Sequence, residues 1–171
     1  MGLAIHPETG ELWETENGPQ GGDELNIIRA GKNYGWPTIS YGRSYTGDVT
    51  GATGPDSDPP VKPGLEQPML FWAPSIALSG LTFYTGDRFP DWKHHLFVTG
   101  LAGEALRRLE TDGDRVVHEE IVFKGFGRVR AVITGPDGLL YIALNVPGVR
   151  LSDTTPGLVV RLVPAPKTMQ P

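Results

Sequence analysis

The chain has no cysteine among its 171 residues, which excludes disulfides, thiolate catalysis and cysteine-ligated zinc. It also has no apolar run near the ~20 residues of a membrane-spanning helix. The net charge is −5 and the basic residues are dispersed, so we expect neither a nucleic-acid nor a membrane partner. No segment keeps a 3.6-residue apolar period, and little helix is therefore expected.

The N-terminus lacks the features of a signal peptide. Met1 is followed directly by the apolar strand expected at residues 2–5, with no basic region and no cleavage site. The sequence alone therefore leaves the localisation of this chain open. A strand that starts at the second residue predicts that the chain begins inside a fold.

What the sequence does contain is one pattern written three times. Each copy is an apolar strand, a turn of Gly, Pro or Asp, and a second apolar strand, and a further strand follows about 25 residues after each start. The copies occupy residues 2–13, 80–98 and 130–141, and the later strands occupy residues 24–29, 105–110 and 158–163. Repeats of several strands at such a period are typical of the blades of a β-propeller.

The predicted fold is all-β, with three blades of a propeller. The 23 glycines and 16 prolines, together with a hydrophobic content of 39%, favour turn-rich β-structure. Blade one is expected at about 2–38 with an insertion at about 39–66, blade two at about 67–117, blade three at about 117–163 and a tail at 164–171. The run Thr111-Asp112-Gly113-Asp114 predicts a hairpin turn within blade two. Since propellers have about four to eight blades, three must pair with something or belong to a longer chain.

The densest polar cluster is residues 14–24, on the loop that leaves the second strand of blade one. Carboxylates and turn-exposed carbonyls suit a hard cation such as calcium. The spacing does not match an EF-hand loop. A polar tight turn capped by Asp23 is the alternative interpretation.

Arg128 and Arg130 lie two residues apart at the start of the innermost strand of blade three. Residues i and i+2 of a strand face the same way, so two guanidinium groups converge. Flanking apolar residues favour an anion site over a solvated basic pair at a strand end, and Arg suits bidentate capture of a carboxylate.

Trp72 stands just before the inner strand of blade two, where it would stack on a flat ligand or sugar ring, or pack in the core. His94 and His95 point to opposite faces if extended and cannot chelate one metal together; both, with His118, are predicted to be surface residues. His6 lies in a turn-forming stretch without a catalytic part. No Ser-His-Asp arrangement, phosphate loop or HExxH motif occurs.

Four motifs resemble those of the glucose/sorbosone dehydrogenase family, soluble quinoproteins that include aldose sugar dehydrogenases. They are residues 14–26 (ETENGPQGGDELN), 33–37 (NYGWP), 72–77 (WAPSIA) and 127–130 (GRVR). The resemblance covers nearly the whole chain, but only the C-terminal half of the family's six-bladed propeller. It implies oxidation of a sugar's C1 hydroxyl, with hydride passing to pyrroloquinoline quinone (PQQ).

The same resemblance implies roles for five residues. Main-chain carbonyls of Gly18 and Pro19 would hold calcium beneath PQQ, Arg128 and Arg130 would bind PQQ carboxylates, and Trp72 would border the sugar site. The family's histidine base and an Arg-Asn pair have no counterpart here, and Ala102 stands where a Lys is usual. The resemblance therefore implies that this chain alone is inactive, with no catalytic residue of its own, and a periplasmic or secreted location.

Three hypotheses follow. The chain is the C-terminal half of a PQQ-dependent sugar dehydrogenase, or two copies close a 3+3 ring as a homodimeric, non-catalytic binding module, or it is a structural propeller without ligand. The first requires a missing N-terminal half as partner and a sugar as substrate.

Overall fold

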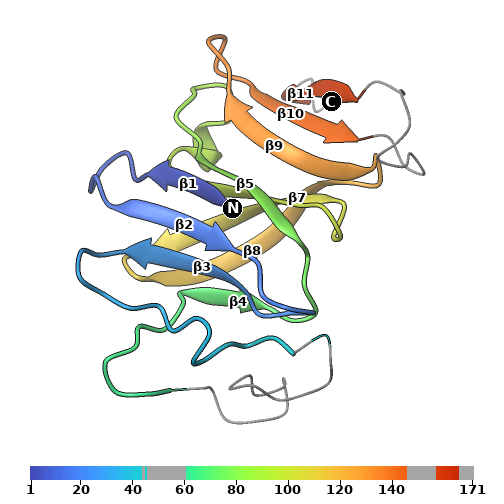
Figure 1. Ribbon diagram of the computed structural model, residues 1–171. Coiled ribbons are helices and arrows are strands. Elements are labelled where there is room, and N and C mark those ends of the chain that lie inside the picture. The colour runs from blue at the N-terminus through green and yellow to red at the C-terminus, as the bar shows by residue number, and fades with distance from the viewer. Residues whose placement is uncertain (44, 46–60, 146–156, 166–171) are drawn as a thin grey trace.

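The computed structural model describes residues 1–43, 45, 61–145 and 157–165 of the chain (Figure 1). These residues form three antiparallel β-sheets, which confirms the predicted all-β class. The one helical element in the described residues is a 3₁₀ turn at Pro90–Trp92, and no helix there could cross a membrane.

The strands follow the chain order within each sheet. The first sheet contains β1 (Gly2–Ile5), β2 (Leu12–Glu16), β3 (Asp23–Ile28) and β4 (Leu70–Trp72). The second contains β5 (Leu78–Phe83), β6 (Leu96–Gly100), β7 (Ala105–Asp112) and β8 (Arg115–Lys124). The third contains β9 (Arg128–Thr134), β10 (Leu140–Asn145) and β11 (Leu158–Leu162).

The sheet boundaries differ from those expected near residues 67 and 117. β4 pairs with β3 and so completes the first sheet, where a start of the second unit was expected. β8 continues to Lys124 in register with β7, through the point where the third unit was expected to begin. The predicted hairpin after β7 is present: Asp112 pairs with Arg115, and Gly113 takes a positive φ of 55°. Residues 46–60 of the expected insertion and the end of the tail lie outside the described residues.

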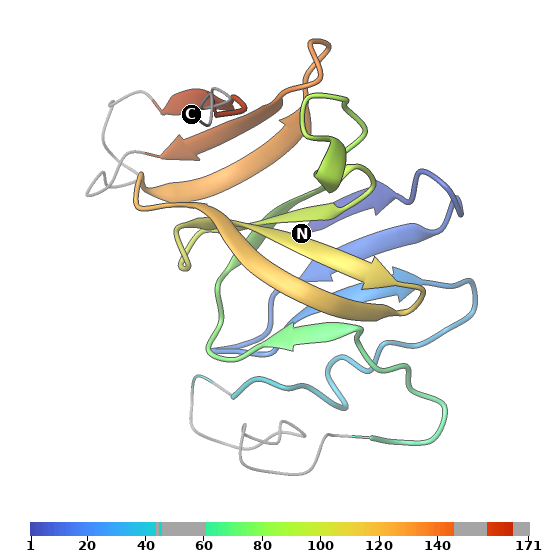
Figure 2. The same ribbon diagram turned by 180° about the vertical axis from the view of Figure 1, so that it is seen from behind.

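The second sheet lies between the other two, as Figures 1 and 2 show. One cluster of buried side chains joins it to the first sheet and includes Trp13, Leu25, Leu81 and Leu109. A second cluster joins it to the third sheet through residues such as Phe97 and Ile142. Alternating apolar residues supply both clusters, because a strand points every second side chain to the same face.

The inner strands of the three sheets lie against one another, with β5 between β1 and β9. Glycine makes this close approach possible. A Cβ on Gly2 would lie 2.7 Å from the Cβ of Leu81, and one on Gly80 would lie 3.0 Å from the Cα of Ala131. Both positions open a copy of the sequence repeat, so the repeat carries a packing requirement as well as a strand pattern.

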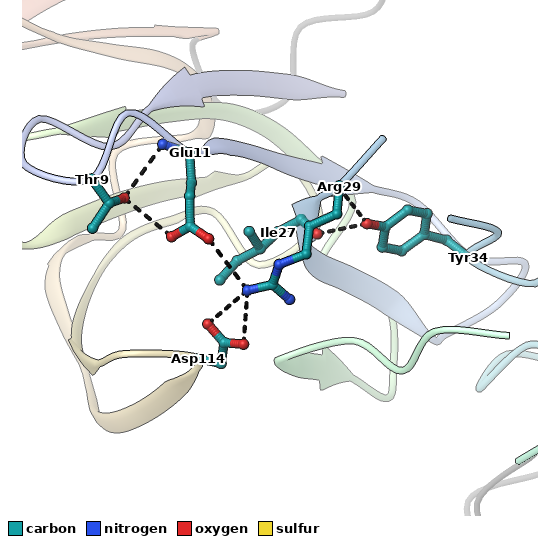
Figure 3. A network of polar contacts seen from close by, with 6 residues as sticks. All are labelled: Thr9, Glu11, Ile27, Arg29, Tyr34 and Asp114. Atoms are coloured by element: carbon teal, nitrogen blue, oxygen red, sulfur yellow. Dashed lines mark hydrogen bonds and ion pairs between the residues drawn. The ribbon is translucent and has the colours of Figure 1, made fainter. Parts of the chain in front are cut away.

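A polar network also links the first sheet to the hairpin between β7 and β8 (Figure 3). Arg29 Nη2 donates to both carboxylate oxygens of Asp114, at 3.0 and 2.8 Å, and to Glu11 at 3.3 Å. The hydroxyl of Tyr34 accepts from the amide of Arg29 and donates to the carbonyl of Ile27. The network fixes the end of β3 against a hairpin that lies far from it in sequence.

Candidate functional site

Four loops lie at one end of the strands, which we call the entry end because the inner strand of each sheet begins there. They are residues 17–22, 73–77, 101–104 and 125–127, toward the right of Figure 1. The pairing places them together, since Asp23 pairs with Trp72, and Leu78, Gly100, Ala105 and Lys124 pair in succession. All five predicted site residues lie at this end.

Asp23 joins two of these loops. Its side chain is fully buried, and Oδ1 accepts the amide of Gly18 at 3.1 Å. Oδ2 accepts the hydroxyl of Ser75 and the amide of Ile76, both at 2.9 Å. The carbonyl of Ile76 in turn accepts amides of the loop at 101–104. Asp23 therefore caps the polar turn at residues 17–22, as the alternative interpretation proposed, because it accepts the amide of Gly18.

The Gly18–Pro19 step is held by backbone contacts. The carbonyl of Pro19 accepts the amide of Arg43 at 2.8 Å, which leaves one of its two lone-pair directions. Gly18 lines a small pocket with the carboxylates of Glu16 and Glu24. Carboxylate and carbonyl oxygens are the ligands that a hard cation prefers. The described residues nevertheless contain no group of three or more His, Asp or Glu arranged to hold a metal ion.

Carboxylates crowd this side of β2 and β3. Glu16 pairs directly with Glu24, and Asn26 Nδ2 donates to Glu24 at 3.3 Å. Burial, opposed by the Asn26 hydrogen bond and reinforced by the charge of Glu16, raises the pKa of Glu24 to about 8. Burial and then Glu16 also raise the pKa of Glu14. Asn26 Oδ1 is buried and has no hydrogen-bond partner among the described residues. The site therefore favours the uptake of a proton or another cation.

Arg128 and Arg130 are both exposed at the start of β9, on either side of buried Val129. Leu144 pairs with Val129 and Ala143 pairs with Ala131, so Arg130 is the extra residue of a β-bulge. Neither guanidinium forms a hydrogen bond or ion pair with the described part of the chain. Two cations without a partner among the described residues are suited to an anion, but the bulge removes the simple same-face relation expected from their spacing, and the anion site stays a prediction.

The backbone of Arg130 is tied to the second sheet. Thr99 Oγ1, which lies on β6, contacts the carbonyl of Arg130 at 3.4 Å and accepts the amide of Gly80 at 2.6 Å. Thr99 is fully buried. The arginine pair therefore has a fixed position relative to the second sheet, although its side chains extend into solvent.

Trp72 is only 7% exposed and packs in the core between the first two sheets. Its indole N–H donates to Glu119 Oε1 at 3.0 Å, and Arg107 Nη1 donates to the same oxygen at 2.6 Å. Trp72 therefore packs in the core, which was one of its two expected roles, and a contact with sugar stays a prediction. Glu119 could not be found from the sequence, because no pattern joins β8 to a tryptophan 47 residues away.

The aromatic side chain that is exposed beside Trp72 is Phe71. Its ring stacks on that of Tyr41 with centroids 4.0 Å apart. The two rings lie next to Glu24, whose charge, after burial, helps to raise the pKa of Tyr41. This pair was not predicted from the sequence, where its only signal is an aromatic residue beside Trp72.

The histidines lie away from the predicted ligand residues. His6 accepts two backbone amides of its own turn and packs edge-on against Phe83, with ring centroids 4.7 Å apart. His94 contacts Glu8 at 2.9 Å, and His95 contacts Arg108. His94 and His95 are partly exposed, and His118 is exposed, as expected for surface residues.

Known proteins match both the sequence and the structure. The family model of glucose / sorbosone dehydrogenases matches residues 1–152. The aldose sugar dehydrogenase YliI of Escherichia coli (strain K12) is 37% identical over 165 residues, which are 96% of this chain and 41% of that protein. An uncharacterized protein of Synechocystis, slr1608, is 40% identical over 162 residues, or 95% of this chain and 36% of that protein.

Solved structures of sugar dehydrogenases also match the fold of this chain. A glucose dehydrogenase superimposes with a TM-score of 0.75 at 50% identity, over 83% of this chain and 40% of that chain. The PQQ-bound form of an aldose sugar dehydrogenase from Streptomyces coelicolor gives 0.67 at 26% identity, over 95% and 42%. The chain spans about two fifths of the length of these relatives. Because the family model covers most of its residues, the chain belongs to the glucose/sorbosone dehydrogenase family.

Proposed function

We propose that this chain is part of a PQQ-dependent sugar dehydrogenase, a six-bladed propeller in which it supplies three blades. The observation that carries the proposal is the exposed pair Arg128 and Arg130, without a partner in the described residues, at the same end as the Gly18–Pro19 loop. Family membership and a PQQ-bound relative support the assignment of cofactor class.

The residues present fit the cofactor unequally. Two exposed guanidinium groups suit carboxylates well, since each can form two parallel hydrogen bonds. The carbonyls of Gly18 and Pro19 would hold calcium, although the Arg43 amide already occupies part of the Pro19 oxygen. When bound, PQQ supplies the quinone that accepts hydride from the sugar C1, and these residues bind and orient it.

Trp72 would contribute to the sugar site from the core side, as the buried neighbour that supports exposed residues of the 73–77 loop. The chain holds no catalytic base by resemblance, so a sugar would be oxidised only with the part of the relatives that this chain lacks. The family resemblance places such a complete enzyme in the periplasm or outside the cell.

The test is a calorimetric titration of the chain with PQQ, in the presence and in the absence of calcium. Replacing both Arg128 and Arg130 with Gln should weaken PQQ binding at least tenfold, and replacing exposed Lys93 and Arg115 with Gln should not. Calcium should tighten PQQ binding in both double variants. Equal affinity of the two double variants would refute the assignment of the arginine pair.

A second candidate function is a non-catalytic binding module formed by two copies of the chain. The observation that favours it is exposed apolar surface at both ends of the stack of sheets, over Leu3 and Ile5 at one end and Ile133 and Val159 at the other. Light scattering tests this candidate, because a closed ring requires a dimer near twice 18.5 kDa at every concentration.

A further inference from the structure

We propose that the Asn17-Gly18 pair is a site of spontaneous deamidation, and that the hydrogen bond from the Gly18 amide to Asp23 sets its rate in the folded chain. The products are aspartate and isoaspartate at position 17. The modification is a reaction of the polypeptide with water, so it goes beyond the proposed function and depends on neither PQQ nor sugar.

The sequence singles out this pair by its second residue. Asn17 is the one asparagine that is followed by glycine, whereas Asn26, Asn33 and Asn145 precede Ile, Tyr and Val. Deamidation begins when the amide nitrogen of the next residue attacks the carbonyl carbon of the asparagine side chain. Glycine hinders this attack least, because it has no Cβ and the greatest backbone freedom.

The structure leaves the side chain of Asn17 accessible. Asn17 is exposed, and its amide forms no hydrogen bond with the described part of the chain. By contrast, Asn26 is only 1% exposed, and Asn33 Oδ1 accepts the amide of Gly35 at 2.8 Å. Water, the second reactant, therefore reaches Asn17 freely, and no contact fixes its side chain away from the Gly18 nitrogen.

Packing requires the glycine that makes Asn17 susceptible. A Cβ at position 18 would lie 2.1 Å from the carbonyl oxygen of Gly21 and 2.5 Å from that of Gly22. Both distances are far below van der Waals contact. No larger residue fits this turn, so the susceptible pair is a consequence of the tight loop between β2 and β3.

The hydrogen bond to Asp23 opposes the reaction. The Gly18 amide donates to Asp23 Oδ1 at 3.1 Å. Asp23 is fully buried, and its other oxygen is held by the Ser75 hydroxyl and the Ile76 amide. The Gly18 nitrogen must lose its proton before it attacks, which would place a negative charge against a carboxylate. This charge-assisted bond therefore stabilises the unreactive form of the amide.

The reaction exchanges an amide for an acid without any change of oxidation state. The Gly18 nitrogen bonds to Asn17 Cγ, the bond from Cγ to Nδ2 breaks, and ammonia leaves with the proton, which closes a succinimide ring. Water then opens the ring. Cleavage of the nitrogen from Cγ gives aspartate, and cleavage from the main-chain carbonyl carbon gives isoaspartate, in which the chain continues through the former side chain.

Both products disturb the loop at the entry end. Asn17 lines the small pocket together with Glu16 and Glu24, so a new carboxylate there adds a like charge beside two others. The isoaspartate linkage also lengthens the main chain immediately before Gly18, in a turn without spare room. The Gly18 amide should therefore lose its hydrogen bond to Asp23 in the converted chain.

Peptide mapping by mass spectrometry tests the proposal on the intact chain at mildly alkaline pH. Asn17 should be the first asparagine to convert, about tenfold more slowly in the folded chain than in the same chain unfolded in urea. D23N should speed conversion in the folded chain about fivefold, because a neutral acceptor opposes loss of the amide proton less. S75A is the matched control, since it removes a donor to Asp23 but leaves the Gly18 bond, and it should keep the wild-type rate.

Circular dichroism shows whether each variant is folded, and deuterium exchange of the Gly18 amide tests the bond without any substitution. A protected Gly18 amide together with slow conversion of the folded wild type supports the proposal even if D23N does not fold. Three results would overturn it: conversion of Asn33 before Asn17, free exchange of the Gly18 amide, or a folded D23N chain that converts at the wild-type rate. Equal acceleration by S75A would also overturn it, because general loosening of the loop would then explain the effect.

Discussion

The second sheet and the two outer sheets differ in how much of their surface is covered by other parts of the chain. Both faces of the second sheet are covered, and its central strand β6 has five consecutive buried residues. The first sheet is covered on both faces at β3, which also has five consecutive buried residues, but its inner strand β1 leaves Leu3 and Ile5 exposed. The third sheet is covered on one face and leaves Ile133 and Val159 exposed on the other. The comparison teaches that a regular repeat supports two kinds of surface: tight, glycine-dependent junctions inside the chain, and exposed apolar residues at its ends.

The largest effect should come from a cavity in a covered junction. Leu109→Ala removes a fully buried side chain from the cluster between the first and second sheets. We expect a loss of about 2–5 kcal/mol in the free energy of unfolding, measured by urea denaturation. A loss below about 1 kcal/mol would mean that this junction is not tightly packed, and the contrast with the end faces would disappear.

The next effect concerns Glu24, a buried carboxylic acid of the first sheet. The pKa of Glu24 is raised from 4.5 to about 8, so the folded chain keeps a proton that the unfolded chain has lost. The contribution of Glu24 to stability is therefore complete below about pH 4.5 and is lost as the pH rises from there through 8, by on the order of 5 kcal/mol.

Glu24→Gln removes this titration and should flatten the dependence of the melting temperature on pH between 5 and 8, raising stability most at the alkaline end. Glu110→Gln is the control, since Glu110 is a carboxylate of β7 in the second sheet, away from Glu24. Identical pH profiles for the Glu24 variant and the wild type would contradict the assignment.

A smaller effect is expected where the inner strands approach. Gly80→Ala places a Cβ 3.0 Å from the Cα of Ala131 and 3.1 Å from Thr99 Oγ1. The neighbours must yield by a few tenths of an ångström, so we expect a loss of about 1–2 kcal/mol in thermal denaturation. Gly113→Ala would be a poor control, because its positive φ of 55° strains an alanine even where the space around it is free.

The smallest effect should come from the open faces. Ile133→Ala in the isolated chain should change the free energy of unfolding by less than about 0.5 kcal/mol, because the side chain is mostly in solvent in both states. Repeating the measurement at high protein concentration sharpens the comparison. A cost that grows with concentration would show that the face is buried by association.

The sequence predicted the fold well where local chemistry decides it. Period-2 alternation and the Asp112-Gly113 turn located strands and a hairpin, since both depend on residues close together. The boundaries failed because β4 has only three residues and joins the first sheet after a long connection, which no local pattern records. Pairing across such a distance is a property of the whole fold.

The site was predictable as a list of residues but not as a set of contacts. The sequence placed Arg128 and Arg130 together at the start of β9, where the structure has them exposed, and the anion site inferred from their spacing stays a prediction. The partners of Trp72 and Asp23 were not predictable, because Glu119 and Ser75 are polar residues without a distinctive neighbourhood in the sequence. The bulge at Arg130 was also missed, although it changes which residues of β9 share a face.

The hydrogen bonds of Asp23 also bear on motion at the entry end. A buried carboxylate that accepts three donors holds the amides of Gly18 and Ile76 as firmly as a strand holds its own. These loop amides should therefore exchange with solvent deuterium as slowly as those of β3, although they lie in connections. Loops already ordered in this way lose little conformational freedom when a ligand arrives.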